Sequence, residues 1–304
     1  MKHLLCTTLL VVLMGALAAG EQAITVDVDL VNIFFTVCNK KGHRIPNLTR
    51  ESFTVFEDDN RQFITNFSQE TDVPLTIALL IDTSGSVRSE LGFEQDAAIE
   101  FLYLTLRPGL DKAAILSFDS SVDLQQDYTG DRQLLANAVR RIRSGGGTRL
   151  YDALCFLLDR TLAEESRRQG IILLTDGDDN SSRSSPRQVV DAAQRKNVAI
   201  YAISVNLISG IASADSARAD EVLKMFARET GGNAFFPSRL KELSASFKQI
   251  SRDLRSQYTI AYRSTNPKRD GTFRKIRIDV NNAHYSVRSR SGYYAPSDVA
   301  TGKE

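Results

Sequence analysis

Three short segments of this sequence carry oxygen ligands in an order that could bind a divalent cation. The first, Asp82-Thr83-Ser84-Gly85-Ser86, follows a continuous apolar run. The second is Gly145-Gly146-Gly147-Thr148, and the third is Thr175-Asp176-Gly177. Carboxylate, hydroxyl and water oxygens are the ligands that Mg²⁺ accepts in its near-octahedral shell. The sequence therefore predicts a metal site with five side chains, namely Asp82, Ser84, Ser86, Thr148 and Asp176.

The five predicted ligands would have two different roles at such a site. Asp82 and Asp176 would supply negative charge, and the hydroxyls of the two serines and Thr148 would supply neutral oxygens. Because there are few anionic ligands, the cation would keep Lewis acidity, and a vacant or water-filled position could accept a carboxylate from a protein partner. The same ligands serve Mg²⁺, Mn²⁺ and Ca²⁺, so the identity of the ion stays open.

The middle of the chain has the pattern of an α/β fold. Residues 75–81 form a continuous apolar run, which is typical of a strand buried on both faces. Strands that alternate with helices predict a mostly parallel sheet covered by helices on both faces, and ligands bind at the carboxyl edge of such sheets. The other predicted strands are 112–118, 170–175 and 198–205, and the predicted helices lie at 93–104, 135–142, 150–162, 185–196, 221–229 and 240–254.

Both ends of the chain have β patterns instead. Neither end has enough strands to bury a core alone, so we expect the two ends to form one small β-domain, with the α/β domain inserted between them. The predicted strands are 24–37, 52–57, 62–67, 258–263, 276–280 and 284–289. The expected divisions are a signal peptide at 1–20, β-segments at 21–72 and 256–295, the α/β domain at 73–255 and a tail at 296–304.

Residues 1–20 have the pattern of a secretory signal peptide. Lys2 precedes an uncharged apolar run, and small residues lead to Glu21. An uncleaved anchor is the alternative, although the run is shorter than the roughly 20 residues of a membrane span. We therefore expect an exported protein, periplasmic or secreted, with no stable membrane span after cleavage.

The composition is that of an ordinary globular protein and points to no polyanionic partner. Hydrophobic residues make up 42% and charged residues 25% of the chain, and the formal net charge is +1. This balance gives no argument for binding nucleic acid or an anionic membrane. Export would allow Cys38 and Cys155 to pair, but their contexts predict two separate, unpaired cysteines.

The three metal-site segments resemble the five-residue metal-ion-dependent adhesion site of von Willebrand factor type A (vWA) domains, in the order of that family. The resemblance covers about residues 73–255 and implies a Rossmann-like vWA fold. It also implies that Ser84 and Ser86 coordinate the ion directly, that Thr148 and Asp176 exchange direct and water-mediated roles, and that Asp82 acts partly through water. The flanking segments are similar to bacterial exported vWA-related proteins; they are Phe53–Asp58, Arg255–Tyr258, Phe273–Ile276 and Arg290–Tyr294.

Some polar residues near these motifs have simpler interpretations. Asp82 or Asp176 taken alone could be a helix cap, because aspartate is common at strand-to-helix turns. We expect Asp119 and the run Asp178-Asp179-Asn180 to be solvated loop residues. His43 and His284 are expected at the surface of the β-segments.

Three functions follow from these observations, and we expect the first. In the first, the protein is a non-enzymatic module that binds an unknown protein partner through a divalent cation. Alternatively, it is a structural docking component of the cell envelope that does not use the metal. A metal-dependent hydrolase ranks last, because it needs a general base and no histidine lies between residues 44 and 283.

Overall fold

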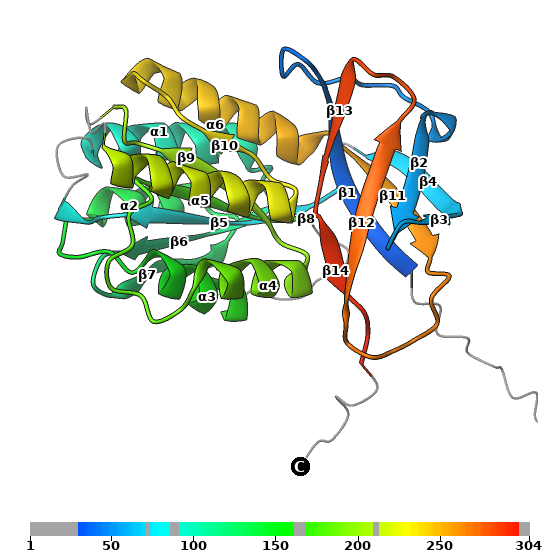
Figure 1. The fold of residues 1–304 in the computed structure, drawn as a ribbon. Helices are drawn as coiled ribbons and strands as arrows, with labels where there is room; N and C mark the ends of the chain where they lie inside the picture. Colours follow the sequence, from blue (N-terminus) through cyan, green and yellow to red (C-terminus); the bar gives the residue numbers. More distant parts are fainter. Residues whose placement is uncertain (1–29, 71–72, 86–90, 161–167, 209–212, 298–304) are drawn as a thin grey trace, which may run out of the picture.

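The structure is a computed structural model that describes residues 30–70, 73–85, 91–160, 168–208 and 213–297. The predicted signal peptide, the first part of the predicted strand 24–37, and Ser86 lie outside these ranges. Two layered units lie side by side, one built of helices around a sheet and one built of strands (Figure 1). Within the described ranges, no helix has both the length and the apolar character needed to cross a bilayer.

The α/β unit contains a mixed, mostly parallel six-stranded sheet with the order β10-β9-β8-β5-β6-β7. Only the edge pair of β6 and β7 is antiparallel among these described strands. The predicted α/β fold is therefore confirmed. The strands are β5 (Leu75–Asp82), β6 (Lys112–Phe118), β7 (Val122–Thr129), β8 (Arg168–Thr175), β9 (Ala199–Ser204) and β10 (Ala234–Phe235).

Helices cover both faces of this sheet, as the fully buried central strand requires. Leu79 and Ile81 of β5 belong to the core beneath α1, α2 and α6, whereas Ala78 and Leu80 belong to the core beneath α3, α4 and α5. Every residue of β5 is buried, because both faces of the strand are covered. The helices are α1 (Leu91–Thr105), α2 (Arg132–Arg141), α3 (Leu150–Arg160), α4 (Pro186–Lys196), α5 (Ala214–Thr230) and α6 (Leu240–Arg255).

The second unit packs two antiparallel sheets, and each sheet combines strands from both ends of the chain. One has the order β13-β1-β11-β4 and the other β14-β12-β2-β3. Phe35, Val55, Ile260 and Ile278 are among the side chains of their shared core. The strands are β1 (Leu30–Asn39), β2 (Phe53–Glu57), β3 (Asn60–Gln62), β4 (Ile64–Glu70), β11 (Gln257–Arg263), β12 (Phe273–Val280), β13 (Tyr285–Ser289) and β14 (Gly292–Tyr294), and a short 3-10 helix, η1, spans Arg50–Ser52.

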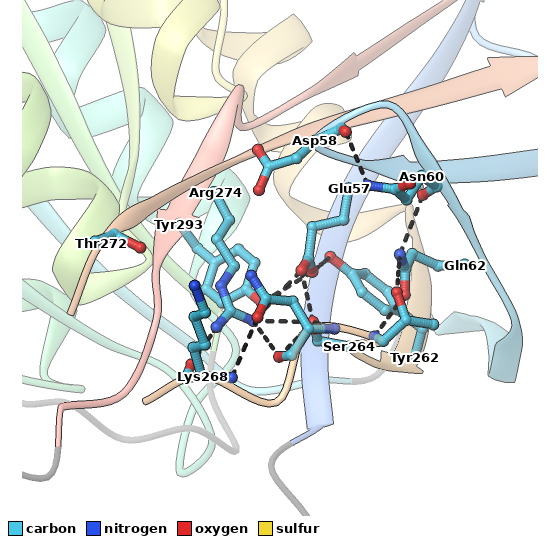
Figure 2. Close-up of polar contacts among 12 residues, drawn as sticks. Glu57, Asp58, Asn60, Gln62, Tyr262, Ser264, Lys268, Thr272, Arg274 and Tyr293 are labelled. Atoms are coloured by element: carbon cyan, nitrogen blue, oxygen red, sulfur yellow. Dashed lines mark hydrogen bonds and ion pairs between the residues drawn. The ribbon is translucent and has the colours of Figure 1, made fainter. Parts of the chain in front are cut away.

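A buried polar cluster joins residues of the N-terminal and C-terminal β-segments (Figure 2). The Glu57 carboxylate accepts hydrogen bonds from the hydroxyls of Tyr262 at 2.8 Å, Tyr293 at 2.9 Å and Ser264 at 2.5 Å. Arg274 lies 3.4 Å from the same carboxylate. Burial, and then the Glu57 carboxylate, raise the pKa of Tyr262 and of Tyr293, so both phenols stay protonated donors. The cluster ties β2, β11, β12 and β14 together.

Two arginines and a buried aspartate join the two units. Arg168, at the start of β8, donates from its guanidinium to the carbonyl of Gln257, the first residue of β11, at 3.4 Å. Arg288 of β13 donates to Asp253 of α6 at 2.8 Å, and the Asp253 side chain is only 1% exposed. Charge-assisted bonds of this kind are stronger than neutral ones, so the contact specifies how the two units are oriented.

Several predicted boundaries were wrong. The predicted strand 62–67 is two strands, because the chain passes from one sheet to the other at the exposed Phe63. The predicted helix 221–229 begins seven residues earlier as α5, where Ser213 and Ser216 form a capping box. The edge strands β7, β10 and β14 were not predicted.

The two cysteines are unpaired, as predicted. Cys38 is buried in β1 and Cys155 is partly buried in α3. His43 and His284 are exposed, also as predicted.

Candidate metal centre

Asp82 and Asp176 lie at the carboxyl edge of the sheet, on the side that faces away from the β-domain (Figure 1). Asp82 is the last residue of β5, and Asp176 directly follows β8. These strands are parallel neighbours in a register that pairs Ile81 with Leu174. Their carboxyl ends therefore meet, and the Thr175 hydroxyl donates to Asp82 Oδ2 at 2.6 Å.

Local hydrogen bonds orient both aspartates. The other oxygen of Asp82, Oδ1, accepts from the backbone N–H of Ser84 at 2.8 Å. Asp176 Oδ1 accepts from the backbone N–H of Asp178 at 3.1 Å. Both are turns that a side chain closes within its own loop. Gly177 has a φ of 80°, so a glycine is needed where the Asp176 loop turns.

The glycine-rich segment is hydrogen-bonded to the Asp82 loop. Gly145 donates its N–H to the Thr83 carbonyl at 2.6 Å, and Gly85 donates to the Gly146 carbonyl at 3.1 Å. A Cβ atom on Gly145 would lie 1.5 Å from Asp119 Oδ2. This close approach explains the glycine at position 145, since a Cβ there would displace the Asp119 side chain, which accepts the Gly146 N–H.

The same segment is bound to the Asp176 loop at its other end. The backbone N–H of Thr148 donates to Asn180 Oδ1 at 3.1 Å, and Asn180 donates its N–H to the Thr148 carbonyl at 3.3 Å. The three predicted segments are thus one hydrogen-bonded unit. Thr148 and Ser84 are both buried there, at 3% and 2% exposure.

Asp119 and Asp179 hold this unit in position, although the sequence predicts only solvated loop residues there. Asp119 accepts the Gly146 N–H at 3.1 Å, and Asp179 accepts the Tyr151 N–H at the start of α3 at 3.0 Å. The sequence offered only a weak signal for either role, namely an aspartate placed near the end of a predicted strand. The sequence predicts no role for Thr175, which in the structure donates the hydrogen bond that orients Asp82.

The electrostatics of the site suit a cation. Asp82 is fully buried, and burial, followed by the nearby charge of Asp176, raises its pKa to about 7. Two buried carboxylates this close are unfavourable unless a positive charge lies between them or one of them is protonated. Within the described ranges, no group of three or more His, Cys, Asp or Glu side chains is arranged to hold a metal ion. The donor set is therefore two carboxylates with hydroxyls, which suits a hard cation that keeps some water.

The structure brings the loops of four predicted ligands to one sheet edge, namely Asp82, Ser84, Thr148 and Asp176. Ser86, the fifth, lies outside the described residues. Coordination of an ion by these five side chains stays a prediction.

Comparisons with known proteins agree with this fold. The sequence model described as the von Willebrand factor type A domain matches residues 76–249, which is more than half of the chain. An uncharacterized protein of Borreliella burgdorferi is 26% identical over 220 residues, covering 68% of this chain. The human von Willebrand factor A domain-containing protein 3B is 29% identical over 168 residues, covering 53% of this chain. The chain spans 62% and 12% of the lengths of these two relatives.

Solved structures of vWA proteins are similar to this chain at low identity. A von Willebrand factor type A protein from Catenulispora acidiphila is 14% identical, with a TM-score of 0.48, and the alignment covers 84% of this chain and 76% of that one. The proximal thread matrix protein 1 of the mussel byssus, with a zinc-occupied MIDAS motif, is 19% identical with a TM-score of 0.48, covering 65% of this chain and 49% of that one. Because the family model matches residues 76–249, which is more than half of the chain, the chain belongs to the von Willebrand factor type A domain family.

Proposed function

We propose that this chain is an exported, non-enzymatic binding protein that recognises a protein partner through a divalent cation. Asp82, Ser84, Thr148 and Asp176 would hold the cation, together with Ser86 from the adjoining part of the first motif. The cation would supply Lewis acidity toward an acidic side chain of the partner. Mg²⁺, Mn²⁺ and Ca²⁺ are the candidate ions. Export rests on the leader pattern of residues 1–20.

One observation carries this proposal. Asp82 and Asp176 are 0% and 4% exposed, and they are close enough for the charge of Asp176 to raise the pKa of Asp82. Burying two neighbouring carboxylates is costly, and a metal ion at a hydroxyl-lined edge offsets that cost. The arrangement has no obvious structural reason, because the helix-cap alternative would need only one carboxylate and no glycine-rich third loop.

The location of the site suits a protein partner. It lies at the end of the α/β domain that is farthest from the β-domain, so a partner could approach without contacting the β-domain (Figure 1). The rim is exposed at Gly85, Asp178 and Asn180, and Leu207 presents an apolar side chain that is 47% exposed. An exposed leucine near a polar site offers apolar area that a protein partner could bury on binding.

The proposal of a binding module instead of an enzyme rests on the absence of a histidine between residues 44 and 283 of the sequence. A hydrolytic water needs a general base within hydrogen-bond reach, and histidine most often fills that role. His43 and His284 belong to the β-domain, whereas Asp82 ends β5 of the α/β domain. Metal-dependent turnover of ester or phosphate substrates would contradict this part of the proposal.

Thermal unfolding with and without metal tests the site directly. The mature protein is unfolded in EDTA and in Mg²⁺, Mn²⁺ or Ca²⁺, alongside Asp176→Ala. A cation at about 100 times its Kd should stabilise the protein by about 2.7 kcal/mol. We expect Asp176→Ala to remove this stabilisation while the variant still folds.

A matched control separates a site effect from a general effect of charge. Asp159→Ala removes an exposed carboxylate from α3 and should keep the full metal response. If no ion stabilises the wild-type protein, or if both variants respond as the wild type does, the metal-binding proposal is wrong. A docking component that does not use the metal would then be the better account.

A further inference from the structure

A second cavity lies between the two domains, at the opposite end of the sheet from the metal centre. Its volume is about 620 Å³. Gln169 near the start of β8, and Asn197 just before β9, form its α/β wall. The amino ends of these strands face the β-domain, whereas Asp82 and Asp176 lie beyond their carboxyl ends (Figure 1). The cavity is therefore independent of the metal-site residues.

The lining of this cavity is strongly basic. It contains no Asp or Glu from any described part of the chain. The chain as a whole is nearly neutral, with a net charge of +1, so this lining is a local concentration of positive charge. Besides Arg274, the cationic residues of the lining are Arg195, Lys196, Arg263, Lys268, Arg269 and Arg290.

Arg274 shows what a neutralised arginine looks like in this protein. Its guanidinium is paired with Glu57 and donates to Ser264 at 2.9 Å and to the Asn266 carbonyl at 2.9 Å, as Figure 2 shows. The partners of this side chain lie within the β-domain. Arg274 thus belongs to the wall of the cavity, and its charge is already balanced.

Arg290 differs from Arg274, because its guanidinium donates to a neutral carbonyl instead of a carboxylate. One guanidinium nitrogen donates to the Asn32 carbonyl at 2.8 Å, while Nε is buried and makes no hydrogen bond within the described residues. Burial lowers the pKa of Arg290 to about 10, and the groups that partly oppose this are Tyr262 and Tyr293. A partly buried cation without a carboxylate partner is costly, and a bound anion would offset that cost.

Aromatic rings hold two of the arginines in place. The Arg195 guanidinium carbon lies 3.6 Å from the centre of the Tyr294 ring, and that of Arg290 lies 5.6 Å from the Tyr293 ring. Stacking orients the planar guanidinium fork, which matches phosphate and carboxylate groups with two parallel hydrogen bonds. The two arginines come from different domains, so an anion between them would contact both α4 and the β-domain.

We propose that this interdomain cavity binds a small organic anion that carries two or more phosphate or carboxylate groups. Its volume lies within the range of about 300–1,000 Å³ found for small-molecule sites, so it can hold a molecule larger than a single inorganic ion. Arg195 and Arg290, with the neighbouring cations of the lining, call for more than one negative group. Phosphate and carboxylate share the chemistry that these arginines recognise, and two probes distinguish them.

The test measures binding of pyrophosphate and of citrate to the mature protein by isothermal titration calorimetry. The titrations are run in EDTA, because both probes chelate divalent cations, and at constant ionic strength, because screening weakens non-specific attraction. We expect at least one probe to bind with a Kd below about 1 mM. Binding of pyrophosphate alone assigns a phosphate ligand, and binding of citrate alone assigns a carboxylate ligand.

Two double variants with equal net charge locate the binding. Arg263→Gln/Lys268→Gln removes two exposed cations of the cavity, and Arg140→Gln/Arg141→Gln removes two exposed cations of α2. The first variant should bind about tenfold or more weakly for each charge-assisted contact that it loses. The second variant should bind the probe as the wild type does. Asp176→Ala should also bind the probe normally, so this result does not depend on the metal-site proposal.

Three results would overturn the proposal. One is that neither probe binds in the millimolar range. Another is that both double variants weaken binding equally, which would show non-specific attraction to positive charge. The third is that the Arg263→Gln/Lys268→Gln variant, shown to be folded by circular dichroism, keeps wild-type affinity.

Discussion

Replacing Glu57 with glutamine should destabilise the β-domain more than any surface substitution. Glu57 and Arg274 are both 2% exposed. The substitution keeps the shape of the side chain but leaves the Arg274 charge buried with only neutral partners (Figure 2). Removing one partner of a buried ion pair costs about 3–5 kcal/mol. Glutamine can still accept from some of the hydroxyls of Tyr262, Tyr293 and Ser264, so we expect the lower half of that range.

The assay is reversible urea unfolding followed by far-UV circular dichroism. Tyrosine fluorescence is the second probe, because the chain has nine tyrosines and no tryptophan. A loss of about 3 kcal/mol corresponds to a drop in Tm of roughly 6–12 °C for a protein of this size. Glu51→Gln, in the exposed helix η1, is the matched control and should change stability by less than about 0.5 kcal/mol.

A double substitution tests the reasoning itself. If the cost comes from an uncompensated Arg274, then Glu57→Gln/Arg274→Met should be less destabilised than the sum of its two single variants, by about 0.5–3 kcal/mol. Strict additivity, or a loss below about 1 kcal/mol for Glu57→Gln alone, would refute the claim that the carboxylate stabilises the buried guanidinium.

Three further predictions concern the metal centre. Thr175→Val removes the 2.6 Å donor to Asp82 and should weaken metal-dependent stabilisation, with a loss of about 1–2 kcal/mol in EDTA by urea unfolding; an unchanged metal response would contradict the positioning role. Gly145→Ala places a methyl group against Asp119 and should impair metal binding more than it impairs the fold, as seen by comparing thermal midpoints with and without metal. The pKa of Asp82 is raised from 3.8 to about 7, so the folded state binds its proton more tightly than the unfolded state does. In EDTA this group should therefore lower stability as pH rises from about 4 to about 7, and the metal should stabilise the protein more at about pH 8 than at about pH 5.5; an equal response at both pH values would argue against ligation by Asp82.

The central α/β elements were predictable because their signals are local. Residues 75–81 are apolar at every position, and a strand with that composition must be covered on both faces. The strand Lys112–Phe118 was predicted at its observed bounds. The edge strands β7, β10 and β14 were missed. Strands β10 and β14 have only two and three residues, and β7 is an edge strand with no buried residue, so none carries a clear periodicity.

The failures have an equally physical origin. Gln62 and Ile64 alternate as one strand would, yet they pair with strands of different sheets, and only long-range contacts decide where the chain crosses. The early start of α5 depends on the Ser213 capping box, which lies before any apolar repeat. The sequence predicts only a solvated Asp119, because the partner of this side chain, the Gly146 N–H, is 27 positions away.

The sequence by itself determined the α/β class, the insertion between two β-segments and the three oxygen-bearing motifs, because periodicity, composition and residue spacing are local properties. Only the tertiary structure decided that Thr175 holds Asp82, that Glu57 neutralises Arg274 and that cations from α4 and the β-domain surround one cavity. Each of these facts joins residues between 93 and 217 positions apart, or residues from separate domains. Charge and hydrogen bonding act over a few ångströms, so such groups interact only after parallel strand pairing and domain packing have brought them together.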